Sequence, residues 1–142
     1  MIVVVCSGLI VDELSGKVLL VHEKKVEKYG LPGGKLESKE SLRECLSREY
    51  KEELGMAISI DDLVLISEKP STHEGNTVIR FFYRAKITDK IVTPELEYDY
   101  YSQEEIDNLT KQDKIRGKDV AHLLKEHFQG KLQTYIEPIM ST

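Results

Sequence analysis

The sequence predicts an α/β fold in which a mixed β-sheet is flanked by helices. Apolar runs typical of strands alternate along the chain with segments that have helical periodicity. Two of the helical segments begin with a capping box, which marks their first turns. Several neighbouring runs are joined by short, hairpin-like turns. Strands joined in both ways favour a mixed sheet covered by helices.

The strands are expected at the apolar runs, in chain order. The run Asp12–Gly16 is rich in turn residues and predicts a hairpin connection between the first two strands. The strand near residue 100 is the most weakly patterned. The expected strands are Ile2–Val11, Lys17–His22, Ser59–Glu68, Val78–Ile87 and Leu96–Tyr101.

The first helix is expected over Leu42–Leu54. Ser41 followed by Glu44 forms a capping box at its start, and Gly55 is a typical stop. A second capping box, Ser102 with Glu105, opens a short helix that runs to about residue 109. A last helix is expected over residues 118–128 and ends before Gly130.

Acidic residues interrupt the apolar face of the first helix. At about 100° per residue, Glu49 and Glu53 project within that face and Glu52 lies at its edge. The apolar face itself consists of Leu42, Cys45, Leu46, Tyr50 and Leu54. Glu49 and Glu53 repel each other as an i,i+4 pair, and Glu52 and Glu53 lie at the negative end of the helix dipole.

A divalent cation among these carboxylates would relieve all three conflicts. Clusters of carboxylate oxygens suit Mg²⁺ or Mn²⁺, hard ions that also bridge phosphates. The alternative is that the three glutamates form a solvated helix face, since glutamate is a good helix former and is usually exposed. Their overlap with the apolar face favours the metal site.

The segment Gly34–Met56 resembles the Nudix box, G-x5-E-x7-R-E-U-x-E-E-x-G-U, in which U is a bulky apolar residue. Tyr50 departs mildly from it, because an aliphatic residue is usual there. Upstream, Leu31–Gly34 resembles the usual L-P-G-G entry of the family, and the looser resemblance covers residues 3 to about 109. The residues in register with the box are Gly34, Glu40, Arg48, Glu49, Glu52, Glu53, Gly55 and Met56.

The resemblance implies a role for each residue that matches the box. Glu49, Glu52 and Glu53 would be metal ligands, with the carbonyl of Gly33 as a further one. Arg48, together with Glu40, would orient those carboxylates. Either Glu52 or Glu53 would position or deprotonate the attacking water.

Some members of this family use a carboxylate on a later loop as the general base. The candidates here are Glu97 and Asp99, of which Glu97 is preferred. The base therefore stays open among Glu52, Glu53, Glu97 and Asp99.

The resemblance also implies the fold and the reaction. The fold would be an α/β/α sandwich with a mixed sheet and the box helix beside it. The enzyme would be a pyrophosphohydrolase that uses Mg²⁺, or Mn²⁺, to hydrolyse a nucleoside diphosphate linked to another group X, giving a nucleoside monophosphate and phosphorylated X. Nucleoside triphosphates and nucleotide sugars such as ADP-ribose are both candidates, with a slight preference for a compact, MutT-like triphosphatase. The alternative is a catalytically silent module that binds a nucleotide or metabolite.

Composition limits the remaining function classes. With 142 residues, the chain is expected to form a single domain, residues 1–142. The net charge of −5 argues against a nucleic-acid binder, whose affinity depends on neutralising phosphates. The expected partner is a small nucleotide substrate, and the protein is expected to be a monomer or a homodimer.

Two further observations concern location. Cys6 and Cys45 are predicted to be small buried hydrophobes in a reducing compartment, neither a disulfide nor a nucleophile. The apolar run at the N-terminus lacks a basic leader and is too short to span a bilayer, so it predicts a strand and no membrane partner. A cytoplasmic location is expected.

Basic residues outside the box are weaker candidates for substrate contacts. Lys24 precedes the glycine-rich entry, where a loop could meet phosphates, and solvated surface is the alternative. Arg80 shares a strand face with Arg84 and Phe82 by period-two alternation, and is a candidate to face the substrate.

Other positions are expected to play ordinary roles. His73 is expected to be an ordinary loop residue, and at least one of Tyr98, Tyr100 and Tyr101 is expected to pack in the core, although a tyrosine here could stack a base. Pro70 lies near the spacing at which ADP-ribose hydrolases of the family carry a proline, without the surrounding motif.

Overall fold

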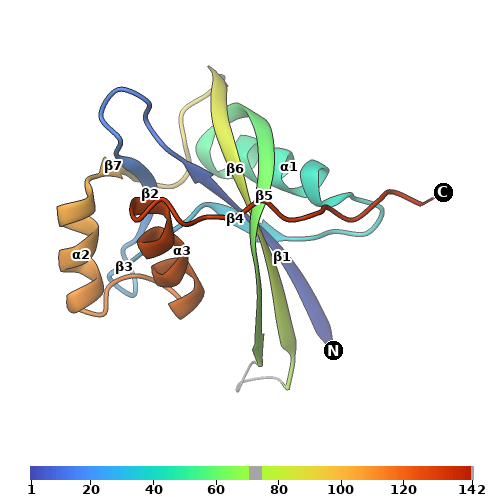
Figure 1. The fold of residues 1–142 in the computed structure, drawn as a ribbon. Coiled ribbons are helices and arrows are strands. Elements are labelled where there is room, and N and C mark those ends of the chain that lie inside the picture. Colours follow the sequence, from blue (N-terminus) through green and yellow to red (C-terminus); the bar gives the residue numbers. More distant parts are fainter. Residues whose placement is uncertain (71–74, 142) are drawn as a thin grey trace.

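The computed structural model describes residues 1–70 and 75–141, and His73 lies outside this range. Two sheets lie between α1 on one side and α2 with α3 on the other, which is the α/β/α arrangement expected from the sequence (Figure 1). The elements are β1 (Ile2–Ile10), β2 (Val18–Glu23), β3 (Lys28–Gly30), β4 (Gly33–Lys35), α1 (Leu42–Leu54), β5 (Met56–Pro70), β6 (Thr77–Lys90), β7 (Tyr98–Tyr101), α2 (Gln103–Lys111) and α3 (Lys118–Phe128).

The larger sheet is mixed, as predicted. Its strands lie in the order β4-β1-β6-β5, and only the β1–β6 pair is parallel. The smaller sheet has the order β3-β2-β7 and is antiparallel. A bridge between Val11 and Val18 joins the two sheets at the predicted hairpin.

Alternation along the strands divides the core into two layers. On β2, Leu19 and Val21 pack in the cluster that contains the apolar face of α1, whereas Val18 and Leu20 pack in the cluster with α2 and α3. This is the consequence of side chains that point to opposite faces at successive positions.

Tyr50 explains how α1 fits against β1. Its side chain is fully buried, and its hydroxyl donates a hydrogen bond to the carbonyl of Gly8 at 3.1 Å. A Cβ at Gly8 would lie 2.3 Å from that hydroxyl oxygen, so the aromatic residue at this box position requires the glycine. The departure from an aliphatic residue is therefore accommodated inside the core.

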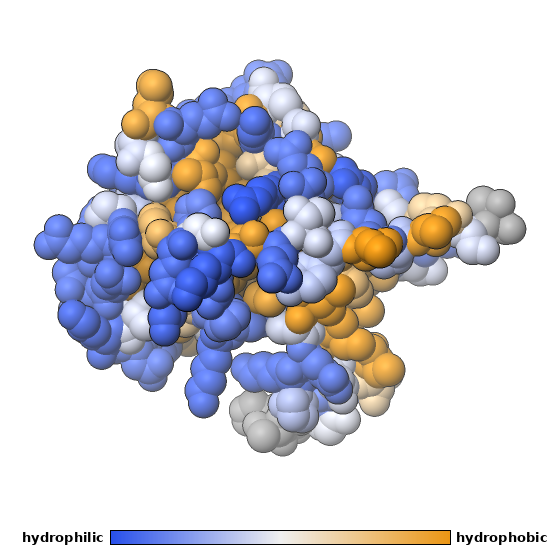
Figure 2. All heavy atoms as spheres, viewed as in Figure 1, coloured by the Kyte–Doolittle hydropathy of each residue, from blue (hydrophilic) through white to orange (hydrophobic). Residues whose placement is uncertain are grey.

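The segment after α3 is extended and returns across the sheet. The amide of Tyr135 donates to the carbonyl of Leu63 on the edge strand β5, and Glu137 accepts two hydrogen bonds from Arg43 on α1, at 2.8 and 2.9 Å. Beyond this tether, apolar side chains are exposed along the segment (Figure 2), including Ile139 at 89%.

Two short strands were not predicted. β3 and β4 contain three residues each and lie in the glycine-rich entry, which has too few side chains to show a periodic pattern. The predicted strands at residues 59–68 and 78–87 are longer in the structure: β5 begins at the buried Met56, and β6 continues to Lys90 as its partner.

Candidate functional site

The box helix α1 is fixed at both ends by its own sequence. At the start, Ser41 accepts a hydrogen bond from the amide of Glu44 at 3.1 Å, and the Glu44 carboxylate accepts one from the Ser41 amide at 2.9 Å, as the capping box predicts. At the end, Gly55 takes the left-handed conformation with φ 62°. The acidic residues between these caps therefore project from a well-defined helix.

Arg48 organises the acidic residues on one side of α1. Its guanidinium donates to both oxygens of Glu40, at 2.6 and 3.0 Å, and to Glu49 at 2.9 Å. It also donates to Glu52 at 3.2 Å and to the carbonyl of Lys35 on β4 at 3.0 Å. The two bonds to Glu40 form the fork geometry that makes arginine a positioning residue.

Electrostatics strengthen the Arg48–Glu40 pair. The hydrogen bond from Arg48, followed by one from the amide of Glu37, holds the pKa of Glu40 below its usual value. The hydrogen bond that Arg48 donates to Glu40 in turn raises the pKa of Arg48. Both groups therefore stay charged at neutral pH, so the arrangement persists there.

The glycine-rich strand makes room for Glu49. A Cβ at Gly34 would lie 2.2 Å from the carboxyl carbon of Glu49, and a Cβ at Gly33 would lie 2.0 Å from the carbonyl oxygen of Cys6 on β1. A side chain at Gly33 would thus meet backbone, whereas one at Gly34 would displace the Glu49 carboxylate. The side chain of Glu49 is 12% exposed and lies directly against Gly34.

Glu53 shows the strain that the sequence predicts. Burial, together with the neighbouring charge of Glu49, raises its pKa to about 7, and the charges of Glu52 and Glu95 act in the same direction. Glu53 is therefore partly protonated at neutral pH in the absence of a cation. A cation placed beside it would stabilise its charged form.

The third carboxylate, Glu52, points elsewhere. Its side chain is 58% exposed and pairs with Arg48. Within residues 1–70 and 75–141, no group of three or more His, Cys, Asp or Glu side chains is arranged so that it could hold a metal ion. The structure therefore brings Glu49 and Glu53 together and leaves Glu52 beside Arg48. The donor set is all oxygen, which fits Mg²⁺ or Mn²⁺.

The loop between β6 and β7 packs against the end of α1. The amides of Glu95 and Leu96 donate to the carbonyl of Glu53, at 3.0 and 3.1 Å. Sequence reasoning missed Glu95, whose charge reaches Glu53. Its proximity depends on where the loop folds back, and only the acidic spacing of residues 95, 97 and 99 could have suggested it.

The two carboxylates proposed on this loop make other contacts. Glu97 pairs with Lys24, with 3.1 Å between the Lys24 Nζ and a carboxylate oxygen, and it lies 3.8 Å from Nδ1 of His22. Asp99 accepts a hydrogen bond from the amide of Tyr100. Tyr98 and Tyr100 pack with the α1-side core and Tyr101 with the opposite core, so core packing holds for all three tyrosines.

Arg80 is held away from solvent by α3. Its Nη1 lies 3.6 Å from Asp119, and its guanidinium carbon lies 5.5 Å from the ring centroid of Phe82. Phe82 is fully buried, so this strand face is packed against α3 and is not an exposed surface. Asp119 also accepts a hydrogen bond from Ser67 at 2.7 Å.

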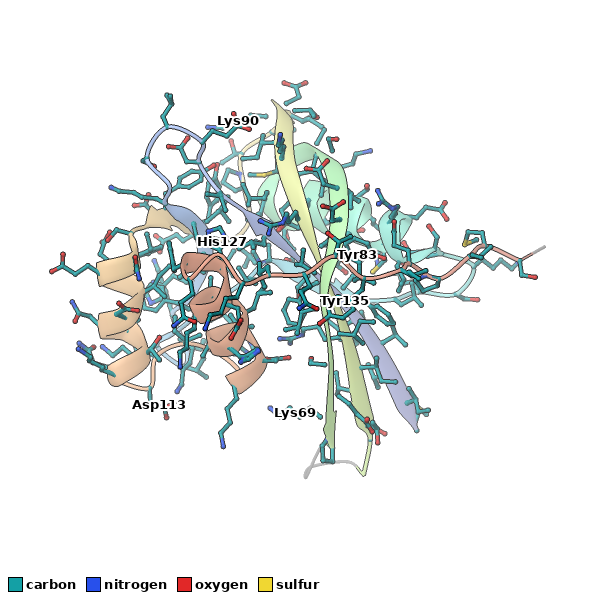
Figure 3. The ribbon with its side chains drawn as sticks, viewed as in Figure 1. Lys69, Tyr83, Lys90, Asp113, His127 and Tyr135 are labelled. Carbon is teal, nitrogen blue, oxygen red and sulfur yellow. The ribbon has the colours of Figure 1, made fainter. Side chains whose placement is uncertain are left out.

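A pocket of about 850 Å³ lies between the β2–β3 hairpin, the outer part of β5 and the start of α3. Lys69 on β5 and Asp113 on the α2–α3 connection belong to its wall and lie on two sides of it (Figure 3). Its volume is typical of a site for a small molecule. Polar and charged residues that line it include Glu23, Lys28, Ser67, Arg116 and Asp119.

The strand segment from β3 to β4 connects this pocket with the carboxylates. A Cβ at Gly30 would lie 3.6 Å from Cβ of Arg116 in the pocket wall, and Gly34 lies against Glu49. Four residues of extended chain span at most about 14 Å. The pocket wall at Arg116 and the Glu49 carboxylate are therefore separated by about the length of this segment.

Comparison with known proteins decides the family. The model of the NUDIX domain matches residues 3–124, most of the chain. The chain belongs to the NUDIX family. This agrees with the order Gly34, Glu40, Arg48, Glu49, Glu52, Glu53 along the sequence, of which the last four lie on α1.

Relatives with assigned names are similar over part of their length. The "8-oxo-dGDP phosphatase NUDT18" of Homo sapiens is 31% identical over 114 residues, which cover 77% of this chain and 34% of that protein. The protein of the same name from Danio rerio is 36% identical over 84 residues, 57% of this chain and 24% of that protein. The chain thus spans about a third or less of the length of these NUDIX relatives.

A solved NUDIX structure is similar over nearly its whole length. The NUDIX hydrolase from Nitrosomonas europaea has a TM-score of 0.75 and 25% identity, and the match covers 94% of this chain and 93% of that one.

No helix among the described residues has the length and apolar character needed to cross a membrane.

Proposed function

We propose that this chain is a metal-dependent pyrophosphohydrolase that cleaves a nucleoside diphosphate linked to another group, releasing a nucleoside monophosphate. The observation that carries the proposal is the pair Glu49–Glu53. It is held by Arg48 on one side and Gly34 on the other, in a chain that belongs to the NUDIX family.

A divalent cation, Mg²⁺ or Mn²⁺, would be held by Glu49 and Glu53, by Glu52 after it leaves Arg48, and by the carbonyl of Gly33. When bound, such a cation supplies charge neutralisation at the diphosphate and lowers the pKa of a coordinated water.

The remaining parts of the site would position the substrate and the water. Arg48 and Glu40 hold Glu49 in place, and Arg48 exchanges partners when Glu52 turns. The pKa of about 7 belongs to Glu53 without a cation, and a bound cation would lower it, so Glu53 would act as a ligand that positions the water. Glu95 is a further candidate for the base, because its loop is bonded to the Glu53 backbone.

The pocket between β5 and α3 would hold the nucleoside, with its phosphates directed along the strand segment toward Glu49. Lys24 would contribute to phosphate binding if it separates from Glu97. Arg80 would act through Asp119, which lines the pocket. Similarity to the 8-oxo-dGDP phosphatases NUDT18 makes 8-oxo-dGDP the first substrate to test, followed by nucleoside triphosphates and nucleotide sugars such as ADP-ribose.

The experiment is a panel assay with purified protein. Nucleoside monophosphate release is measured from 8-oxo-dGDP, nucleoside triphosphates, nucleotide sugars and dinucleoside polyphosphates, with Mg²⁺, with Mn²⁺ and with chelator. We expect metal-dependent release from at least one class, and loss of at least about a hundredfold in Glu53→Gln. Glu104→Gln, the same change at an exposed residue of α2, is the matched control and should keep full activity.

The same assay separates the candidates for the base. The variants compared over a pH series are Glu52→Gln, Glu53→Gln, Glu95→Gln, Glu97→Gln and Asp99→Asn. The variant that lacks the general base should lose the ascending limb of the pH profile. Binding of nucleotide without turnover of any panel member, with and without metal, would instead favour the alternative of a silent binding module.

A further inference from the structure

Two buried thiols lie beneath the acidic site and have no part in the proposed reaction. Cys6 on β1 and Cys45 on α1 are both fully buried in the same core cluster, and interaction with the Cys45 thiol, followed by burial, raises the pKa of the Cys6 thiol. The sequence predicted both as small buried hydrophobes, neither a disulfide nor a nucleophile, and their burial is confirmed. The fold also brings them together beside Gly34, although they are far apart in the chain.

Both thiols contact the residues that organise the site. Cys6 is the cross-strand partner of Gly34, and the Cys45 thiol donates to the carbonyl of Gly34 at 3.7 Å. The guanidinium of Arg48 donates to the Cys45 sulfur at 3.8 Å. Gly34 and Arg48 are also the two neighbours that fix Glu49.

From this geometry we infer that Cys6 and Cys45 form a site of reversible oxidative modification, a disulfide that inactivates the carboxylate site. The activity readout rests on the proposed function, whereas formation of the bond does not.

The chemistry requires a peroxide as oxidant. The Cys45 sulfur attacks one peroxide oxygen, the O–O bond breaks, and Cys45 becomes a sulfenic acid while one water leaves. The Cys6 sulfur then attacks the Cys45 sulfur, the S–O bond breaks, and a second water leaves. Two thiols lose two electrons in total, and a dithiol reductant reverses the bond by exchange.

Cys45 is the sulfur expected to react first. It contacts Arg48, whose side chain is 21% exposed, whereas Cys6 lies deeper on the central strand β1. Because neither thiol touches solvent, oxidation requires transient opening of α1, and it should be slow in the native protein.

The bond would disturb the site through a short path. A disulfide holds its sulfurs about 2.05 Å apart, much closer than two thiols in contact. Closing that gap draws α1 toward β1 and removes the bond from Cys45 to Gly34. This approach would displace the Glu49 carboxylate, because that carboxylate already fills the space beside Gly34. A displacement of about 1 Å in a catalytic group can cost about a hundredfold in rate.

The test uses the full chain treated with hydrogen peroxide. Free thiols are counted, intact mass is measured, and activity is followed before and after dithiothreitol. We expect loss of both thiols with a mass decrease of two hydrogens, a fall in activity of about a hundredfold, and recovery on reduction. Cys6→Ser, which cannot form the bond, is the control and should resist reversible inactivation.

Several outcomes would overturn the inference. One is that both thiols stay reduced during peroxide treatment until the protein unfolds. The others are a gain of oxygen without a disulfide, or a disulfide that leaves activity unchanged. If the untreated protein has no activity on any substrate, the thiol count and mass still decide whether the bond forms, so failure of the proposed function is distinguishable.

Discussion

The pKa of Glu53 gives a quantitative prediction for the metal-free protein. Burial and the charge of Glu49 raise it from 4.5 to about 7, so the folded state binds a proton that the unfolded state releases. The stabilisation from that proton is fully present below pH 4.5 and is lost as the pH rises through about 7. The free energy of unfolding should therefore fall across this window.

The magnitude follows from the difference between the two pKa values, which corresponds to at most about 3 kcal/mol. Glu53 is partly exposed, and solvent screening lowers the expected value to about 1–3 kcal/mol. Glu53→Gln removes the titrating group, so the variant should lack this part of the pH dependence. At pH 8 and without metal it should melt about 3–9 °C above the natural sequence.

The assay is thermal unfolding of both proteins from pH 4.5 to 8.5 with chelator, repeated with Mg²⁺. Metal should restore the stability of the natural protein at pH 8 and have little effect on Glu53→Gln. Parallel pH profiles for the two metal-free proteins would refute the argument that Glu53 is strained.

Other changes test the surroundings of the carboxylates. Gly34→Ala should reduce turnover at least about tenfold, because the new Cβ displaces the flexible end of Glu49. The variant should lose only about 1 kcal/mol of stability. Steady-state kinetics and denaturant unfolding measure the two effects. Arg48→Lys loses the fork to Glu40 and should lower activity about 10–100-fold, with normal activity in the variant contradicting its positioning role. Ser102→Ala removes the cap of α2 and should cost about 1 kcal/mol in unfolding experiments, while the rate of nucleotide hydrolysis stays unchanged.

Local chemistry made the helices predictable. Ser41 with Glu44 and Ser102 with Glu105 form the expected capping boxes, and the bounds 42–54 and 118–128 agree with the structure. The longer strands were predictable in position because their apolar side chains meet the two cores. β3 and β4 were not, since glycine gives no hydropathy pattern and their pairing depends on β1 and β2.

The site was predictable where it lies within one helix and not where the fold assembles it. Periodicity placed Glu49 and Glu53 on one face, and the structure brings them together. The sequence could not show that Glu95 reaches Glu53, that Asp119 holds Arg80, or that Cys6 meets Cys45, because each contact joins separate elements.

The most direct measurement of the central claim is the number of protons released when Mg²⁺ binds, obtained by calorimetry at pH 6.5 in two buffers of different ionisation enthalpy. With its pKa about 7, Glu53 is mostly protonated at this pH, and coordination should displace about 0.8 proton. Glu53→Gln should release close to none and bind the ion at least about tenfold more weakly. Binding of Mg²⁺ with equal affinity and no proton release in both proteins, or no binding in either, would contradict a cation held by these glutamates.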